Sequence, residues 1–428
     1  MTQAPKSLRL HIGIFGRTNV GKSSFLNMIA GQDVAIVSDV PGTTTDVVEK
    51  PMELLPIGPV VFLDTAGVDD TSQLAELRVA RSRRIFDRAE VIALVLEPDI
   101  WTGYEDGILV EAAARKVPVI CVVNKADIGA PSKEFLAALE EKSGRIMVCS
   151  SVEKAGREAS LALLKQHILE VCPEEFLAPP PLIGDLLSSG KGVGLAVLVV
   201  PIDLQAPRGR LILPQVQTIR DTLDCDGAVA VVKEREYAAF LQQLRVPPDI
   251  AVCDSQVVLK MTGDTPRGVP CTTFSILFAR SKGDLVEMAR GAAVLSDIGP
   301  DDRILIAEAC SHHAIEDDIG RVKIPRWLRQ YAGADVRIDT TAGRDYPENL
   351  SQYRLVIHCG GCMLTRREML SRIEKARQAG VAITNYGVAI SVLQGVIERT
   401  LSPFPAALDA YRREKARMRA ARAAMAGV

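Results

Sequence analysis

Between Arg9 and about Cys172, short apolar runs rich in β-branched residues alternate with stretches of helical periodicity. Apolar runs bounded by turn residues predict strands, and strands that alternate with helices predict a parallel sheet with helices on both faces. The first part of the chain is therefore predicted to be an α/β domain with a doubly wound parallel sheet. Its predicted strands are Leu8–Phe15, Val60–Leu63, Val91–Leu96, Val119–Val123 and Arg145–Cys149.

Two more α/β units are predicted after a proline-rich break. The stretch from Glu174 to Leu182 contains three successive prolines, which cannot continue a helix, so it is predicted to be a linker. A second segment rich in helix and strand breakers runs from Thr262 to Pro270. We therefore expect three domains, at residues 1–175, 176–265 and 266–428: a nucleotide-binding domain, a middle α/β domain and a C-terminal α/β domain.

The same patterns predict the elements of these two units. In the middle unit, strands are predicted near Gly194–Val200 and Ala228–Val232, and helices near Gln215–Leu223 and Arg235–Leu244. In the C-terminal unit, the predicted strands are Arg303–Ala307, Tyr353–His358 and Val381–Ile383, and the predicted helices are Gly283–Leu295, Pro325–Ala332 and Arg366–Gln378. An Arg- and Ala-rich helical pattern closes the chain from Tyr411 to Ala426.

Composition narrows the class of protein. The chain has 428 residues, of which 47% are hydrophobic and 24% charged, which is typical of folded domains. A formal net charge of −2 gives no overall attraction to nucleic acid or anionic membranes, and no apolar run reaches membrane-spanning length. The first strand starts too early to leave room for a signal peptide, so we expect a cytoplasmic protein. There, its nine cysteines would be thiols or metal ligands rather than disulfides.

A glycine-rich segment lies between the first predicted strand and a helical pattern. Its sequence, Gly16-Arg-Thr-Asn-Val-Gly21-Lys22-Ser23, has the Walker A spacing. Glycines let backbone N–H groups wrap phosphates, and the helix N-terminus adds a favourable dipole. Lys22 is predicted to reach the β- and γ-phosphates and the Ser23 hydroxyl to bind Mg²⁺, with Ser24 also in the site.

The residues that would complete the Mg²⁺ site follow in order. Asp64-Thr-Ala-Gly67 comes after the strand Val60–Leu63, so Asp64 is predicted to hold Mg²⁺ through water and Gly67 to sense the γ-phosphate. Between the two motifs lies a run of threonines, of which Thr44 is our first choice and Thr43 our second for the Mg²⁺ shell.

Two later loops predict that the base is guanine. Asn124-Lys125-Ala-Asp127 follows the strand Val119–Val123, and an aspartate there can accept from the N1–H and the exocyclic amine of guanine. Such a site rejects ATP, because adenine would leave the carboxylate unpaired. Ser150 and Ser151 fit the loop whose backbone N–H contacts the guanine O6. The order and context of all these motifs predict a GTPase.

Two positions refine the expected catalysis. Val68 follows Gly67, where Ras-like proteins carry the glutamine that orients the attacking water, so we expect slow intrinsic hydrolysis. Asn19 in the glycine-rich loop resembles the TrmE-type tRNA-modification and Era-like GTPases. In that branch the asparagine helps to bind a potassium ion in place of an arginine finger. The resemblance implies that potassium stimulates hydrolysis.

Three cysteines and three histidines form two tight groups near the ends of predicted C-terminal strands. Cys310-Ser-His312-His313 follows the strand Arg303–Ala307, and His358-Cys359-Gly-Gly-Cys362 ends the strand Tyr353–His358. Carboxyl ends of neighbouring parallel strands open onto one crevice, so the two groups are expected to meet. The residue types fit a Cys₃His zinc site, an iron–sulfur cluster with three thiolates or a redox dithiol, and the pattern alone leaves these open.

A GTPase of this type, joined to a middle domain and then to these cysteine and histidine groups, resembles the iron–iron hydrogenase H-cluster maturation GTPases (the HydF family). The matching C-terminal positions are Cys310, His312, His358, Cys359 and Cys362, and the segment from Pro201 to Gln215 resembles that family's dimerisation domain. The resemblance implies a homodimer with a 4Fe–4S cluster on Cys310, Cys359 and Cys362. His312 and His358 are candidate ligands, neighbours of the ligands or precursor contacts.

The resemblance also implies a function and partners. The protein would carry or assemble the two-iron precursor of the H-cluster, work with radical-SAM maturation enzymes and deliver the precursor to apo-hydrogenase. The alternative is an RNA- or ribosome-associated GTPase with a structural zinc module. That alternative calls for a basic, aromatic surface, and the Arg-rich tail is the one basic segment that stands out. A nucleic-acid or membrane partner is therefore not expected.

Overall fold

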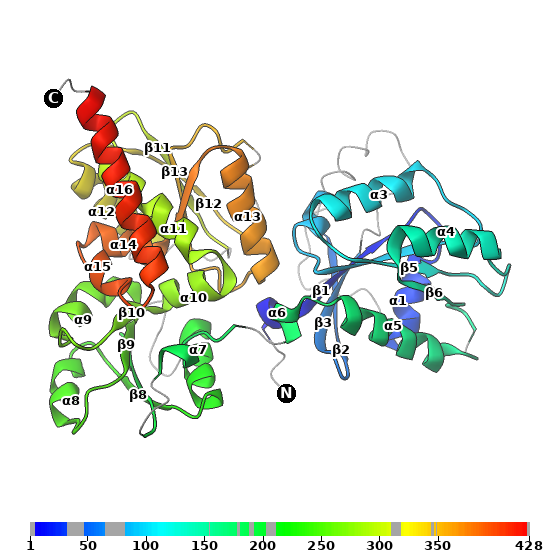
Figure 1. Ribbon diagram of the computed structural model, residues 1–428, viewed down its shortest axis with the longest axis horizontal. Helices are drawn as coiled ribbons and strands as arrows, with labels where there is room; N and C mark the ends of the chain where they lie inside the picture. The colour runs from blue at the N-terminus through cyan, green and yellow to red at the C-terminus, as the bar shows by residue number, and fades with distance from the viewer. Residues whose placement is uncertain are drawn as a thin grey trace. The chain divides into compact units, whose positions relative to one another are not determined.

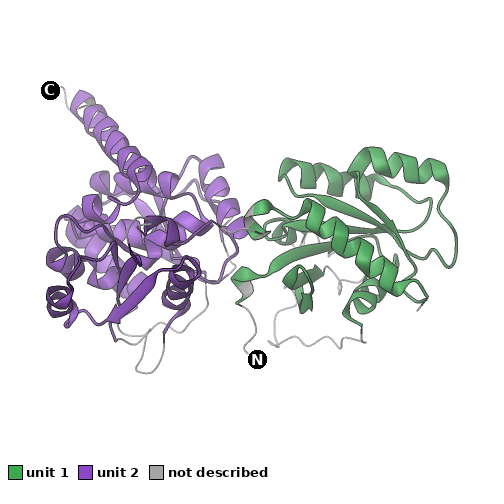
Figure 2. Cartoon of the chain, turned by 60° about the horizontal axis from the view of Figure 1, so that its bottom comes forward, with its two compact units in different colours: residues 1–179 green, residues 180–428 purple. Residues whose placement is uncertain are grey.

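The computed structural model describes residues 5–31, 47–64, 82–153, 155–177, 180–187, 192–202, 211–309, 318–343, 346–347 and 349–425. The chain divides into two compact units, residues 1–179 and residues 180–428 (Figure 2). In the described part of the chain, no helix combines the length and the apolar character needed to cross a membrane.

The first unit is built on a six-stranded sheet with the order β2-β3-β1-β4-β5-β6 (Figure 1). All neighbours are parallel except β2, which pairs with β3 in the antiparallel direction. The strands are β1 (Leu10–Phe15), β2 (Val48–Leu54), β3 (Gly58–Asp64), β4 (Val91–Leu96), β5 (Val119–Val123) and β6 (Ile146–Val148). The helices are η1 (Lys6–Leu8), α1 (Lys22–Ala30), α3 (Gly103–Ala114), α4 (Lys133–Ser143), α5 (Arg157–Val171) and α6 (Glu174–Leu177).

Helices cover both faces of this sheet. Every residue of β1 is buried, and its alternate side chains enter two different cores. Ile12 and Ile14 pack in one core with residues of α1 and α5, whereas Phe15 packs in the other with residues of α3 and α4. This arrangement confirms the predicted doubly wound α/β fold of the first domain.

The second unit contains two parallel sheets of four strands each. The middle sheet has the order β10-β9-β7-β8 and the C-terminal sheet the order β12-β11-β13-β14 (Figure 1). In the middle part, the elements are η3 (Gly184–Leu186), β7 (Leu195–Val199), α7 (Leu213–Asp224), β8 (Ala228–Val232), α8 (Tyr237–Gln243), β9 (Ile250–Cys253), η4 (Ser255–Val257), α9 (Val258–Asp264), β10 (Cys271–Thr273) and α10 (Phe274–Lys282).

The C-terminal part follows α10 directly. Its strands are β11 (Arg303–Ala307), β12 (Arg337–Thr341), β13 (Leu355–His358) and β14 (Ala382–Asn385). Its helices are α11 (Leu285–Ala292), η5 (Ala293–Asp297), η6 (Ile319–Lys323), α12 (Ile324–Ala332), α13 (Arg366–Gln378), α14 (Tyr386–Leu393), α15 (Ile397–Thr400) and α16 (Pro405–Met425). One continuous core contains side chains from both sheets, among them Leu198, Ile306 and Ile357, together with Leu277 of α10.

Helix α10 links the two sheets of this unit. It begins immediately after β10, where the Thr273 hydroxyl accepts a hydrogen bond from Ile276 N at 3.2 Å and caps the helix. Strand β10 belongs to the middle sheet although it follows residue 265, where the sequence predicts the end of the middle domain. The three domain ranges stay a prediction.

Most strands match the sequence pattern, whereas β2, β9, β10 and β12 were not predicted. Strand β2 is missed because its sequence is polar and contains Pro51, which an edge strand tolerates. The predicted linker is wrong at its start, because Glu174–Leu177 forms one helical turn before the prolines. The predicted helix Gly283–Leu295 starts later, because the Asp284 side chain caps α11 by accepting from Glu287 N. It then ends in the 3₁₀ helix η5.

The Arg-rich tail forms helix α16, whose arginines make ion pairs with carboxylates. Arg413 pairs with Asp409 and Arg417 with Glu414 on the same helix. Arg412 reaches Glu398, and Arg422 lies 3.7 Å from Asp297. These ion pairs offset part of the positive charge of α16, as on an ordinary solvated helix face.

Candidate functional site

The glycine-rich loop lies at the carboxyl end of β1 and leads into α1. Gly16 has φ of +149° and Gly21 has φ of +93°, a region that side chains with a Cβ rarely adopt. A Cβ on Gly16 would lie 2.5 Å from Val95 O, and one on Gly21 would lie 2.3 Å from Asn124 Nδ2. Both glycines are therefore required by backbone conformation and by close packing against β4 and the loop after β5.

Lys22 begins helix α1 and folds over this loop. Its Nζ donates to Gly16 O at 2.9 Å and to Arg17 O at 2.8 Å. Ser23 is exposed and Ser24 half-buried in the first turn of the same helix. Asp64, at the end of β3, is 2% exposed. The order β3-β1 in the sheet puts Asp64 on the strand next to the one that leads into the loop, as a Mg²⁺ site requires.

Asn124 joins the glycine-rich loop to the loop after β6. Its Nδ2 donates to Val20 O at 3.0 Å, and its Oδ1 accepts from the backbone N of Ser151 at 3.1 Å and from the Ser151 hydroxyl at 2.8 Å. Asn124 is 1% exposed, whereas Asp127 is exposed and Ser150 is half-buried. The arrangement fixes the backbone around Ser151 and leaves the Asp127 carboxylate accessible to a base.

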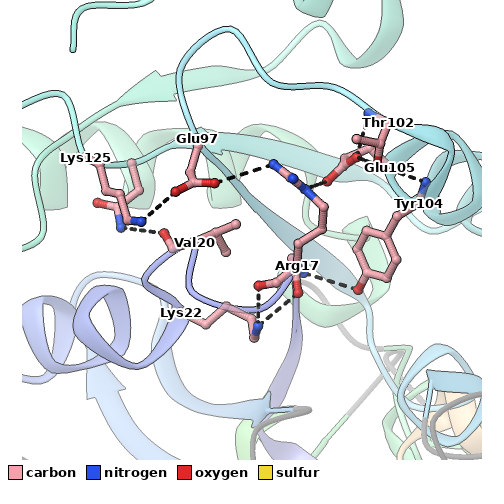
Figure 3. A network of polar contacts seen from close by, with 10 residues as sticks. Arg17, Val20, Lys22, Glu97, Thr102, Tyr104, Glu105 and Lys125 are labelled. Carbon is pink, nitrogen blue, oxygen red and sulfur yellow. Dashed lines mark hydrogen bonds and ion pairs between the residues drawn. The ribbon is translucent and has the colours of Figure 1, made fainter. Parts of the chain in front are cut away.

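A network of charges surrounds the glycine-rich loop (Figure 3). Arg17 Nε donates to Glu105 Oε1 at 2.9 Å, and Arg17 Nη2 lies 3.6 Å from Glu97 Oε2. Glu97 also accepts from Lys125 Nζ at 2.6 Å. Glu105 is fully buried, and it accepts from the backbone N and the hydroxyl of Thr102 at the start of α3. The network thus connects the glycine-rich loop, α3 and the loop after β5.

Sequence reasoning missed this network. The Thr102-Gly-Tyr-Glu105 spacing is a capping-box pattern and predicts the start of a helix, but no pattern predicts that Glu105 pairs with Arg17 across the sheet edge. Three predicted nucleotide-site residues lie outside the described residues: Thr43, Thr44 and Gly67. Asn19 is exposed in the loop with φ of +64°.

The cysteine group lies at the carboxyl edge of the C-terminal sheet. Strand β11 pairs with β12 on one side and β13 on the other, so the strand order reverses its direction between β11 and β13. Ala307 is the register partner of His358, and Cys359 N donates to Ala307 O at 2.9 Å. Beyond β11, Ala309 N donates to Cys359 Sγ at 3.1 Å. Ala309, the last described residue before Cys310, therefore meets Cys359 at this edge.

The turn between the two thiols is tight. Gly361 has φ of +63°, and Leu364 N donates to Gly361 O at 3.0 Å. Cys359 and Cys362 are both half-buried. Burial raises the pKa of the Cys362 thiol, and the nearby charge of Lys282 opposes that shift. The described residues contain no group of three or more His, Cys, Asp and Glu side chains that could hold a metal ion. Cys310 and His312 lie outside the described residues.

His358 is completely buried, and both of its ring nitrogens are engaged. Its Nδ1 donates to Cys359 O at 2.8 Å, and its Nε2 accepts from Arg372 Nη1 at 2.9 Å. Burial, together with the charge of Arg372, lowers the pKa of His358 to about 3, so the imidazole is neutral. In this arrangement His358 supports the Cys359 backbone, which is one of the roles left open by the sequence.

Two cations from other helices bracket the cysteine turn, and neither was predicted from the sequence. Lys282, the last residue of α10, donates from Nζ to Cys362 O at 3.1 Å and to Leu364 O at 3.0 Å. Arg366, the first residue of α13, donates from Nη1 to Ser281 O and Gly283 O, both at 3.0 Å. Burial lowers the pKa of Lys282 to about 8, while the thiols of Cys362 and Cys359 oppose the shift.

Comparison with known families divides the chain into three matched regions. Residues 11–125 match the family model described as "50S ribosome-binding GTPase". Residues 182–283 match the "Hydrogen maturase F dimerization domain", and residues 286–403 match the "Hydrogen maturase F tetramerization domain". The two hydrogen maturase F models together account for nearly all of the second unit before α16.

Individual relatives match only part of the chain. A tRNA modification GTPase MnmE from Synechococcus sp. (strain CC9605) is 38% identical over 168 residues, which cover 37% of this chain and 37% of that protein. A second MnmE, from Synechococcus sp. (strain JA-3-3Ab), is 46% identical over 124 residues, or 28% of this chain and 26% of the relative. The chain thus spans about a third of the length of these relatives.

Solved structures similar to this chain include two GTPases. A single-residue variant of Aquifex aeolicus Era bound to GDP and AlF₄⁻ is 27% identical, covers 38% of this chain and 57% of its own, and has a TM-score of 0.32. The G domain of the T. maritima FeoB iron transporter is 22% identical, covers 38% of this chain and 98% of its own, and has a TM-score of 0.29.

Proposed function

Because the chain belongs to the hydrogen maturase F family, we propose that it is a GTP-gated scaffold in hydrogenase maturation. In this role it carries or assembles the di-iron precursor of the H-cluster and delivers it to apo-hydrogenase. The observation that carries the proposal is the position of Cys359 at the switch point between β11 and β13, where Ala309 N donates to its sulfur at 3.1 Å. Ala309 directly precedes Cys310, which we propose as the third cluster ligand.

At the carboxyl edge of the C-terminal sheet, which carries Cys359 and Cys362 (the thiol edge), a 4Fe–4S cluster would be held by Cys310, Cys359 and Cys362. Backbone N–H donation to a thiolate, low exposure and nearby positive charge are the features by which proteins stabilise such clusters. With three thiolate ligands, a bound cluster supplies one iron whose fourth position can exchange. His358 and Arg372 hold the backbone at Cys359, which keeps the first thiolate of the pair in place. Thus a scaffold can present a reactive edge without closing it with a fourth cysteine.

The first unit would bind and hydrolyse GTP. Lys22 and the loop amides would neutralise the phosphates, and Ser23, Thr44 and Asp64 would hold Mg²⁺. Gly67 would sense the γ-phosphate, while Asp127 and the Ser151 backbone would select guanine. Hydrolysis should be slow, because Val68 cannot orient water, and potassium bound with the help of Asn19 should stimulate it. In a switch of this kind, γ-phosphate contacts order loops and hydrolysis releases them.

Self-association is proposed to use the middle sheet. Strand β8 lies at the edge of this sheet, inside the region that matches the dimerization domain, and Val231 on it is 45% exposed. An exposed strand edge can pair with the same strand of a second copy. A Val231→Asp variant should therefore shift the homodimer toward monomer in light scattering, whereas Val246→Asp, also exposed but off the sheet, should leave the dimer intact.

Activation of apo-hydrogenase tests the proposed function directly. The chain is purified without oxygen from cells that also express the radical-SAM maturation enzymes and is then mixed with apo-hydrogenase, and hydrogen evolution is measured. We expect activation by the natural chain and by Cys225→Ser, which removes an exposed cysteine far along the sequence from the thiol edge. Activation should be lost in Cys359→Ser. Equal activation by the Cys359→Ser variant would falsify the proposal.

A further inference from the structure

A buried lysine lies beneath the turn that carries Cys359 and Cys362. Lys282 is 7% exposed and ends α10, the helix that starts at the last strand of the middle sheet. Among the residues that the structure describes, its ammonium makes no ion pair with a carboxylate, and the ionisable groups that face it are the two thiols. A buried ammonium without a carboxylate partner is costly, and negative charge on the two thiolates would offset part of that cost.

The hydrogen bonds of Lys282 hold the turn in its observed shape. The ammonium donates to Cys362 O at 3.1 Å and to Leu364 O at 3.0 Å. In the opposite direction, Arg366, which follows the turn, donates to Ser281 O and Gly283 O on either side of Lys282. Hydrogen bonds from the two cations, one in each direction, therefore tie the end of α10 to the segment that carries and follows Cys362.

The start of α10 is also fixed to the C-terminal sheet. Ser275, in the first turn of this helix, accepts from Gly387 N at 3.1 Å through its hydroxyl, and the Asn385 amide donates to its backbone oxygen at 2.7 Å. Asn385 ends β14, the strand next to β13. Helix α10 is thus fixed at both ends to the carboxyl edge of the C-terminal sheet, which places the charge of Lys282 at a defined position.

We infer that Lys282 is a positioning residue of the thiol edge, which fixes the Cys359–Cys362 turn and supplies the positive charge that balances its thiolates. This inference rests on the proposed function, because it assigns Lys282 to the cluster proposed there. A cluster held by thiolates becomes more negative when it is reduced, and a nearby cation stabilises the reduced form. Lys282 therefore raises the reduction potential of the cluster.

The test is an EPR-monitored redox titration of the full chain after anaerobic reconstitution with iron and sulfide. Lys282→Met and Lys282→Gln remove the charge, and Lys282→Arg keeps it. The matched control is Lys260→Met, since Lys260 is an exposed lysine that pairs with Asp264 on α9. We expect both neutral variants to titrate at a lower potential than the natural chain, Lys282→Arg to restore the potential, and Lys260→Met to leave it unchanged.

The outcomes separate this inference from the proposed function. If a neutral variant takes up the cluster and titrates at the potential of the natural chain, the role assigned to Lys282 is wrong, whereas the proposed scaffold function is unaffected. If the natural chain takes up no cluster, the proposed function fails and this inference with it. Should Lys282→Met not fold, Lys282→Gln carries the comparison. Loss of cluster uptake in both folded neutral variants, with recovery in Lys282→Arg, would support the positioning role.

Discussion

The carboxyl edges of the first sheet and of the C-terminal sheet are both proposed to bind negatively charged groups, but the compensating positive charge comes from different parts of the fold. At the first edge, negative phosphates would meet backbone amides and one lysine from a single short segment, residues 16–22, which two glycines shape. At the C-terminal edge, the thiolates of the proposed cluster would come from separate stretches of the sequence. The cations near the described cysteines come from two further helices: Lys282 bonds the cysteine turn, and Arg372 bonds His358.

The two edges differ in the groups that compensate the negative charge, because oxygen and sulfur differ as hydrogen-bond acceptors. Phosphate oxygens accept many hydrogen bonds, so one loop of backbone N–H groups and a helix N-terminus can supply most of the compensation. Sulfur accepts hydrogen bonds weakly, and at the C-terminal edge Ala309 N donates to Cys359 Sγ at 3.1 Å. Charged side chains that are held in place by tertiary packing, such as Lys282, then supply a larger part of the compensation. The phosphate charge would therefore be compensated mainly by one segment, and the thiolate charge mainly by side chains from other helices.

Base selection at the first edge should show the largest effect. Replacing Asp127 with Ala removes the acceptor for the guanine N1–H and exocyclic amine, so discrimination between GTP and ATP should fall by on the order of 10⁴-fold. Competition binding with both nucleotides measures this. Asp99→Ala is the control, since Asp99 is an exposed carboxylate that accepts from Ser132 N at 3.0 Å, outside the base-binding motif. Unchanged selectivity in Asp127→Ala would exclude the assigned base site.

The next largest effect should be the separate loss of GTP hydrolysis at one edge and of cluster uptake at the other. Lys22→Ala should lower GTP hydrolysis by about 10²- to 10³-fold, because one preorganised donor to developing phosphate charge is lost. Cluster uptake, measured as bound iron and sulfide, should be unchanged in this variant. Cys359→Ser should show the reverse, with normal hydrolysis and no cluster. Loss of both properties in either variant would mean that the edges are not separate sites.

Asn124 offers a test of how preformed the nucleotide edge is. Asn124→Ala leaves Val20 O and the Ser151 groups without their buried partner, so unfolding of the first unit should become easier by about 1–3 kcal/mol. The chain has two tryptophans, Trp101 and Trp327, so a Trp327→Phe background lets Trp101 fluorescence report this unit during urea unfolding. Ser150→Ala is the matched control, since its hydroxyl accepts a long 3.3 Å bond from Glu153 N. An equal effect of both changes would contradict the bridging role.

Potassium dependence should be the smallest of these effects. Hydrolysis in potassium should exceed that in sodium by about tenfold, equivalent to about 1.4 kcal/mol of transition-state stabilisation. Asn19→Ala should remove the difference, whereas Thr18→Ala, also exposed in the loop, should retain it. Equal hydrolysis rates of the natural chain in potassium and in sodium would contradict the proposed potassium site.

The sequence predicts the nucleotide-binding edge of the first sheet better than the thiol edge, because the first is built from one contiguous segment and the second from several. Contiguous motifs record the backbone shape of the phosphate loop, and runs such as Val91–Leu96 and Val119–Val123 are buried on both faces, so periodicity finds them. Edge strands β2 and β12 are polar and are missed. Lys282 was not found because a lysine at the end of a helix is usually solvated, and only packing reveals that this one is buried beneath the cysteines.

EPR of the dithionite-reduced chain tests the central claim most directly. The natural chain, Cys359→Ser and Cys225→Ser are purified without oxygen and reconstituted with iron and sulfide, and their spectra are recorded side by side. The account predicts a 4Fe–4S signal in the natural chain and in Cys225→Ser, and none in Cys359→Ser. A chain that binds stoichiometric zinc and takes up no iron, or a signal that persists in Cys359→Ser, would contradict it.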